Sequence, residues 1–405
     1  MINRKKKIIS AVEMAAVSAI MIVAVQAGYS ARNPVIAAPT PTQENGVITA
    51  EEWEETYPEI VASYHANSDN SYRIDYLEED PYLVNVYEGF GFAKDYTSAI
   101  GHTYTLEDVK NTERPHALAN CLTCKTADFT KLVNDMGVEA YKYDFDETWA
   151  KMNESVGCYS CHENQPGEMV VTHSYVTTQL GDNVQDMDAT VLSCGQCHIE
   201  YYFDPETKET LMPYHSVEEM GPEAILAYYD EMGFSDWTQE STGTGLLKAQ
   251  HPEFETYMNG SIHAKMGVSC ADCHMAKMTS DDGVEYTSHK WESPLENEVL
   301  TESCAACHKD VDIAEKVKAI QEEVIAREKE VGENLSGLKT ALAEAVAGGE
   351  YTEEQLDEIR YKYRAAQWYW DYCYVENSEG AHNSALAKNC LNMADEIIAE
   401  AMELL

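Results

Sequence analysis

The chain has few positive charges and few segments with the alternating pattern of β-strands. It contains 28 lysines and arginines against 71 aspartates and glutamates, a formal net charge of −43 over 405 residues. A protein that binds nucleic acid neutralises phosphates with lysine and arginine, so this composition excludes nucleic acid as a partner. Because strand patterns are scarce, the sequence predicts a mainly α-helical protein.

Only two cysteines lie outside a repeated motif. The other ten form five Cys-x-x-Cys pairs, followed by histidine in four cases and by lysine in the first. Two thioether bonds to such a pair attach a c-type haem, and the next residue then lies under the iron as a ligand. The pairs with their following residues are Cys121 and Cys124 with Lys125, Cys158 and Cys161 with His162, Cys194 and Cys197 with His198, Cys270 and Cys273 with His274, and Cys304 and Cys307 with His308.

Zinc sites, redox dithiols and disulfides are the other uses of paired cysteines. Tetrahedral zinc does not require histidine directly after the second cysteine. Disulfides would explain an even number of cysteines but not this regular pattern. The sequence therefore predicts five covalently bound c-type haems. Cys373 and Cys390, outside the motifs, are expected to be buried thiols, with a disulfide between them as the alternative.

Lys125 distinguishes the first motif from the others. An electron relay needs both axial positions of its iron filled, so the four histidine motifs require four further histidines. The chain has 13 histidines, and the four in the motifs leave nine. Lysine binds a metal only as the neutral amine, an unusual choice for simple electron transfer. We therefore expect the first haem to be a catalytic centre.

The N-terminus has the composition of an export signal. Residues 4–7 are basic, and an apolar stretch follows up to Ala27. Residues 1–27 are thus expected to be either a cleaved signal peptide or an uncleaved membrane anchor, and residues 28–47 a linker. We expect the excess of acidic residues to form the solvated surface of an exported protein. The alternative is that they form a docking face for a basic redox partner.

The remaining chain divides into two regions by its pattern. Residues 48–312 contain short helical and loop segments that carry the motifs, and they predict an irregular, haem-packed catalytic domain. Residues 313–405 predict long helices: one of about 50 Å ending at Gly348-Gly349, one after the capping box at Thr352, and one from Ser384 to Leu405. The first is too long to bury its apolar stripe on a compact domain, so we expect a homodimer along it, with an intramolecular hairpin as the alternative.

From about Pro81 to Leu391 the sequence resembles the ammonia-forming pentahaem cytochrome c nitrite reductases. The similar segments extend well beyond the haem motifs themselves. They are residues 101–114 around Gly101-His102, Leu106–Val109 and Arg114; residues 194–203; residues 247–253; residues 286–290; and residues 366–368.

This resemblance implies roles for particular residues. Lys125 would be the proximal ligand of the catalytic haem, with Arg114, Tyr201 and His251 around its open face. His289, His102, His382 and His263 would be the distal ligands of the second, third, fourth and fifth haems. The other histidines, His65, His116, His173 and His215, are expected to be surface or hydrogen-bonded residues.

The resemblance also implies a calcium ion and an electron donor. Its oxygen ligands would be the carboxylate of Glu200, the backbone oxygens of Tyr201 and Lys248, and the side chain of Gln250, which suit a hard cation. The donor would be a membrane-bound quinol-oxidising cytochrome or another low-potential protein, and the location would be periplasmic or otherwise extracytoplasmic.

The implied reaction is the six-electron reduction of nitrite to ammonium. Two alternatives use the same haems: reduction of another small oxyanion such as sulfite, and electron transfer without catalysis. A zinc-binding scaffold would bind no haem at all.

Overall fold

The computed structural model describes residues 38–405, and residues Pro41–Leu405 form one compact unit. The expected signal peptide or anchor, and most of the expected linker, lie outside the described residues. In the part that the structure describes, no helix is both long enough and apolar enough to cross a membrane.

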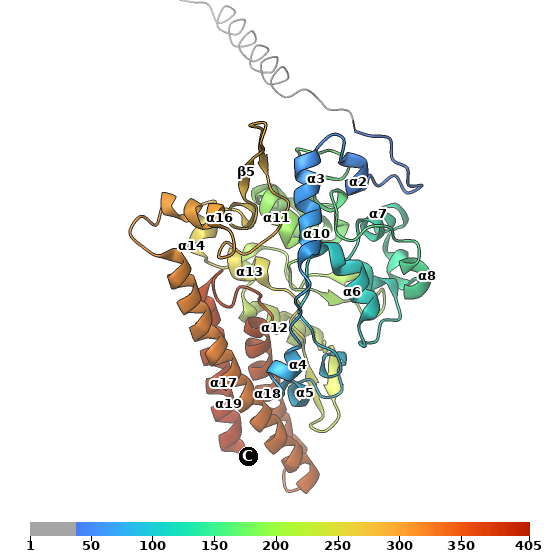
Figure 1. Ribbon diagram of the computed structural model, residues 1–405. Helices are drawn as coiled ribbons and strands as arrows, with labels where there is room; N and C mark the ends of the chain where they lie inside the picture. The colour runs from blue at the N-terminus through green and yellow to red at the C-terminus, as the bar shows by residue number, and fades with distance from the viewer. Residues whose placement is uncertain (1–37) are drawn as a thin grey trace, which may run out of the picture. The chain divides into compact units, whose positions relative to one another are not determined.

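Short helices joined by loops make up most of the chain before the long C-terminal helices (Figure 1), and the five haem motifs lie in or beside these short helices. Several are fixed by side-chain caps on their first backbone N–H groups, such as Asp144 before α8 and Ser269 before α15. The α-helices are α2 (Ala50–Trp53), α3 (Pro58–His65), α4 (Tyr76–Glu79), α5 (Leu83–Val86), α6 (Thr105–Asn111), α7 (Ala127–Met136), α8 (Phe145–Trp149), α9 (Tyr159–His162), α10 (Ser174–Leu180), α11 (Ala189–Gly195), α12 (Pro222–Met232), α13 (Glu253–Met258), α14 (Ile262–Lys265), α15 (Cys270–His274) and α16 (Glu298–Ser303). The 3₁₀-helices are η1 (Ala66–Asp69), η2 (Gly91–Ala93), η3 (His102–Tyr104), η4 (Ala119–Leu122), η5 (Val138–Lys142), η6 (Gly181–Asp186), η7 (Val217–Glu219) and η8 (Cys304–Ala306).

The strands of the described chain are short and form three separate two-stranded antiparallel sheets. In the second sheet Trp237 pairs with Leu246, and the turn between its strands contains Gly243 at φ +71°, a backbone conformation that glycine adopts without strain. The strands are β1 (Tyr202–Phe203), β2 (Thr210–Leu211), β3 (Trp237–Gln239), β4 (Thr244–Leu246), β5 (Lys277–Thr279) and β6 (Glu285–Thr287).

Three long helices end the chain: α17 (Ile313–Gly348), α18 (Glu353–Tyr374) and α19 (Ser384–Leu404). The C-terminal end of α17 is capped by Gly349 in the left-handed conformation. A capping box between Thr352 and Gln355 begins α18. The boundaries agree with those expected from the sequence, and the predicted fold class is confirmed.

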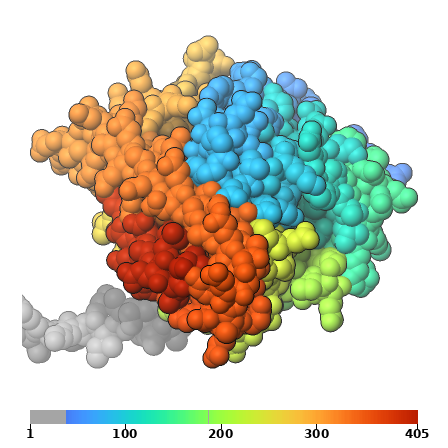
Figure 2. Space-filling view, turned by 90° about the horizontal axis from the view of Figure 1, so that it is seen from below, coloured from blue at the N-terminus to red at the C-terminus, as the bar shows by residue number. Residues whose placement is uncertain are grey.

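The three helices pack on one another, side by side in Figure 1, so the intramolecular hairpin considered above is formed. Their shared core contains Leu335, Leu338 and Trp370. α17 also packs against α5, and Figure 2 shows its orange surface next to the blue N-terminal segment. Residues near the start of α17 remain largely exposed, so a homodimer along this helix stays a prediction.

Candidate functional site

Each haem motif lies in or overlaps a short helical turn: η4 for the first, α9 for the second, α11 for the third, α15 for the fourth and η8 for the fifth. In the first motif, the Lys125 N–H donates to the Leu122 carbonyl at 3.0 Å. The Lys125 carbonyl accepts a 2.7 Å hydrogen bond from the Thr105 hydroxyl. The lysine backbone is therefore held between η4 and α6.

The motifs lie next to one another in the order first, third, fourth and fifth. The sulfurs of Cys124 and Cys197 join the first to the third motif in a group with His173, whose ligand atoms all lie within 4.8 Å of one another. The thiols of Cys194 and Cys270 contact each other and join the third to the fourth. The fifth motif follows through the contact of α15 with α16. Such a row suits electron transfer along adjacent haems.

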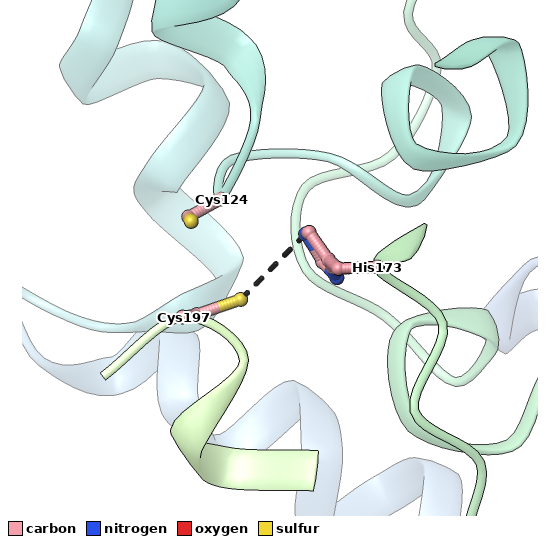
Figure 3. Close-up of side chains that lie close together, drawn as sticks. All are labelled: Cys124, His173 and Cys197. Atoms are coloured by element: carbon pink, nitrogen blue, oxygen red, sulfur yellow. Dashed lines mark hydrogen bonds between the residues drawn. The ribbon is translucent and has the colours of Figure 1, made fainter. Parts of the chain in front are cut away.

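Figure 3 shows Cys124, His173 and Cys197 pointing toward one another. Two cysteines and a histidine resemble a partial zinc site. Each cysteine, however, belongs to a different haem-attachment pair, and a thioether sulfur is no thiolate ligand. The arrangement therefore fits two closely spaced haems and not a further metal ion.

Four histidines lie opposite the four motif histidines. The distances between ring centres are 6.1 Å for His162 and His289, 6.0 Å for His198 and His102, 6.2 Å for His274 and His382, and 6.2 Å for His308 and His263.

These distances can be compared with the separation expected for two imidazole rings that bind the same metal ion. A ring nitrogen lies about 2.0 Å from a bound transition metal such as zinc, so two imidazoles on opposite sides of one ion have ring centres about 6 Å apart. The separations therefore fit one iron between the rings of each pair. All four pairs combine the distal and proximal residues expected from the sequence.

Four of these eight histidines are also oriented by a hydrogen bond from the other ring nitrogen. Nδ1 of His162, His274 and His289 lies 2.7–3.0 Å from the backbone oxygens of Glu168, Glu292 and Thr287 respectively. Nδ1 of His382 instead lies 2.6 Å from the carboxylate of Glu376. Such outer partners fix the ring and the nitrogen left free to bind metal.

The residues expected around the open face come from separate segments near the first motif. The Arg114 guanidinium lies 4.4 Å from the centre of the Phe92 ring, and its Nε donates to Thr112 at 3.0 Å. Tyr201 packs beside Phe203, and burial raises the pKa of its hydroxyl well above the usual value. The positive charge of Arg114 opposes that shift, so Arg114 and Tyr201 are near neighbours.

His251 lies near Lys125 and the third motif, with its ring centre 6.4 Å from that of His198. The residue is exposed, yet burial by surrounding protein, opposed by the charge of Glu253 and assisted by that of Lys125, lowers the pKa of its ring to about 4. The imidazole of His251 is therefore neutral at pH 7.

The four residues expected to hold calcium lie together. Glu200 is buried, and its carboxylate accepts from the Gln250 N–H at 2.6 Å and from the Tyr229 hydroxyl at 2.9 Å. The Gln250 side chain touches the Lys248 carbonyl at 2.9 Å. Burial raises the pKa of Glu200 well above its usual value, so a bound cation would favour its ionised form. The donor set fits a hard cation, with the Gln250 amide turned so that its oxygen faces the ion.

A sequence model of the cytochrome c552 family matches residues 49–405, which is most of the chain. The chain belongs to the cytochrome c552 family. Among solved structures, this cytochrome is similar to the cytochrome c nitrite reductase from Desulfovibrio desulfuricans ATCC 27774, whose catalytic subunit is described with two calcium sites. The two chains are 27% identical, the match covers 90% of this chain and 87% of that one, and the TM-score is 0.80.

A second solved structure, the outer cell wall cytochrome OcwA, is 20% identical with a TM-score of 0.40. The match covers 73% of this chain and 48% of the OcwA chain, and this similarity is too low to support an argument. The family expected from the sequence motifs is confirmed by the family match and by the reductase structure.

Sequence reasoning missed the buried charged groups that surround the site of this cytochrome. Lys248 is fully buried, and its ammonium group contacts Asp371 at 2.9 Å and three aromatic rings, those of Tyr87, Phe92 and Tyr96. Asp371 also accepts from the N–H of Ala249 at 3.0 Å. These contacts tie α18 to the segment that carries His251. Because an aspartate inside an amphipathic helix is ordinary, the sequence contains no signal for this role.

The four remaining histidines lie as expected outside the ligand pairs. His65 is exposed, and His116 and His215 contact backbone oxygens at 2.9 and 3.1 Å. His173 is buried and hydrogen-bonded. Cys373 and Cys390 are free and buried, which agrees with the prediction of buried thiols.

Proposed function

We propose that this cytochrome reduces nitrite to ammonium, with six electrons and eight protons consumed per nitrite and two waters released. The observation that carries the proposal is the contrast between the five motifs. The four motif histidines each face a second histidine, whereas the neighbours of Lys125 include His251, a neutral imidazole. The lysine-bound haem would supply an open coordination position and electrons when present.

Side chains of this protein would supply binding and protons. The Arg114 guanidinium stabilises negative charge on the nitrite oxygens, against the repulsion of a strongly acidic chain. The neutral His251 ring can donate one N–H proton and recover it from solvent. The Tyr201 hydroxyl, kept protonated by burial, donates a hydrogen bond that orders substrate and water. The facing histidine pairs would hold the four relay haems.

The test is ammonium production from nitrite with a low-potential electron donor. Native, haem-loaded protein is expected to form ammonium. Lys125→His is expected to lose most of this activity, and His251→Asn to lower it by about 10²–10⁴-fold, the usual contribution of a general acid or base. His65→Asn, at an exposed histidine, is the matched control. Haem-loaded native protein without nitrite-dependent ammonium would contradict the proposal.

Sulfite reduction is separated from nitrite reduction by comparing kcat/KM for the two anions on the same preparation. An electron carrier without catalysis would show five low-spin haems and no turnover of either anion. We expect a preference for nitrite and one high-spin haem. The electron donor is proposed to be a membrane-bound quinol-oxidising cytochrome or another low-potential protein, the location extracytoplasmic, and the assembly a homodimer.

Calcium is proposed to bind beside the active face, at Glu200, Tyr201, Lys248 and Gln250. The buried carboxylate of Glu200 supports this site, because an ionised carboxylate in protein surroundings needs a positive partner. Glu200→Gln is expected to lower calcium affinity at least about tenfold, since even outer-shell changes cost 10–100-fold. Calcium per chain, measured by elemental analysis after dialysis, gives the result. Glu206→Gln, at an exposed glutamate, should retain the ion.

A further inference from the structure

Glu376 forms a short hydrogen bond with His382, the distal ligand proposed for the fourth haem. Its Oε1 lies 2.6 Å from Nδ1 of His382, and its Oε2 accepts from the Ser378 hydroxyl at 2.5 Å. The Ser378 hydroxyl also accepts from the backbone N–H of His382 at 2.9 Å. Glu376 is only 4% exposed. Both carboxylate oxygens are therefore fixed, and one of them is directed at the histidine ring.

The loop that holds these residues is tightly built. It follows the end of α18, and it contains Glu379 at φ +54° and Gly380 at φ +87°. A Cβ at Gly380 would lie 2.7 Å from a methyl carbon of Val324 in α17, so the loop lies directly against that helix. The position of this loop against α17 and the hydrogen bonds of Ser378 together orient Glu376 toward His382.

The other expected ligands have weaker outer partners. In the second haem pair, His162 and His289 both face neutral backbone oxygens, at 2.7 and 3.0 Å. In the third pair, Nδ1 of His198 lies 3.7 Å from a carboxylate oxygen of Glu253, too far for a direct hydrogen bond. The described chain thus gives the fourth haem a direct charged acceptor that the second haem does not have.

The negative charge of the Glu376 carboxylate affects the reduction potential of the iron that His382 would bind. A hydrogen bond to a carboxylate makes an imidazole a stronger electron donor to its metal, and the effect is larger for a buried, charge-assisted bond. Stronger donation stabilises the oxidised iron relative to the reduced iron, and second-shell hydrogen bonding is one of the means by which a protein sets haem potential.

We propose that Glu376 is a positioning residue that lowers the reduction potential of the fourth haem through His382. The inference rests on the haem assignment made under the proposed function. The fourth motif lies between the third and the fifth motifs in the row described above. A low potential at this place would keep the fourth haem from retaining an electron, so that the electron is passed on to a neighbouring haem of the row.

The test is a spectroscopic redox titration of haem-loaded protein without nitrite. Glu376→Gln retains an acceptor for His382 and removes the charge. We expect one low-spin haem to shift to higher potential, with a matching change in the electron paramagnetic resonance signal of that haem alone. Glu168→Gln is the control, because it removes one exposed charge while the backbone oxygen that accepts from His162 remains. No shift in Glu376→Gln, or an equal shift in the control, would overturn the proposal.

A second variant tests the direction in which Glu376 shifts the haem potential. Ser378→Ala removes the hydroxyl that donates to the other carboxylate oxygen, so Glu376 becomes a stronger acceptor for His382. The same haem should then shift to lower potential, and an unchanged or higher potential contradicts the inference. Ammonium formation is assayed separately. If the potential shifts as expected but the native protein forms no ammonium, only the proposed reaction is refuted. If the native protein forms ammonium but the variants show no shift in potential, only the role of Glu376 is refuted.

Discussion

At the scale of single residues, His173 connects two haem motifs that are distant in sequence. Its Nε2 lies 2.9 Å from the carbonyl of Thr123, inside the first motif, and its Nδ1 lies 3.1 Å from Oε1 of Gln196, inside the third. Gln196 is itself fixed by its amide group, which donates to the Ser160 carbonyl at 2.7 Å. One buried imidazole therefore helps to set the spacing between the motif of the proposed catalytic haem and its neighbour.

Replacement of His173 should destabilise the haem-loaded protein. His173→Ala leaves buried acceptors without a donor, which costs about 1–3 kcal/mol for each group. His173→Gln can still donate one hydrogen bond and should lose less. The measurement is the midpoint of thermal unfolding at equal haem content. His65→Gln, at an exposed histidine, should leave the midpoint unchanged, and an equally unchanged His173→Ala would contradict this bridging role.

At the scale of elements, two glycines in the interior of α17 have opposite surroundings. A Cβ at Gly332 would lie 2.5 Å from the ring of Tyr82, whereas a Cβ at Gly337 would meet no atom within 4 Å. The absence of a side chain at Gly332 thus permits the close approach of α17 to the segment before α5. At Gly337 no close contact requires glycine, and glycine there is only a weaker helix former than alanine.

Alanine substitutions at these two positions should therefore have effects of opposite sign. Gly332→Ala forces the Tyr82 ring to move and is expected to cost about 1–3 kcal/mol, as is usual for overpacking. Gly337→Ala is expected to stabilise the protein by up to about 1 kcal/mol, because alanine is the better helix former. Unfolding midpoints of both variants give the comparison. Destabilisation by Gly337→Ala would contradict the open surroundings found there.

Signals confined to a few neighbouring residues allowed these elements to be predicted. The glycine pair at the end of α17 and the capping box before α18 each act within one helical turn, so their positions could be read from the sequence. The cysteine motifs are local in the same way. The distal histidines have no local signal, and they could be named only by resemblance to a family.

Other features depend on contacts between distant segments. Glu376 and His382 lie in one loop between α18 and α19, and that loop lies against the distant helix α17. The buried pair of Lys248 and Asp371 joins residues from different parts of the chain. Such contacts depend on packing, and the composition of either segment alone does not indicate them.

At the scale of the whole molecule, the excess of acidic residues extends into the interior. Glu154 and Glu328 are buried in different parts of the fold, and burial raises the pKa of Glu154 to about 7 and that of Glu328 to about 8. The Glu328 carboxylate accepts from the Cys373 thiol at 3.2 Å, and the charges of Glu379, Glu376 and Asp80 contribute to its raised pKa. The folded protein thus binds protons that the unfolded chain releases near pH 4.3.

The stability of the protein should therefore fall as the pH rises from about 5 to about 8. A group whose pKa is higher in the folded state contributes stability that is fully present below its unfolded pKa and is lost as the pH passes its folded pKa. Glu328→Gln keeps an acceptor for Cys373 and cannot ionise, so it should raise the midpoint of thermal unfolding at pH 9 and change it little at pH 5. Glu330→Gln, at an exposed glutamate of the same helix, is the control and should show no such difference. Equal midpoints of the native protein and Glu328→Gln at pH 9 would show that Glu328 carries no such penalty, because its ionised form would then be fully compensated in the fold.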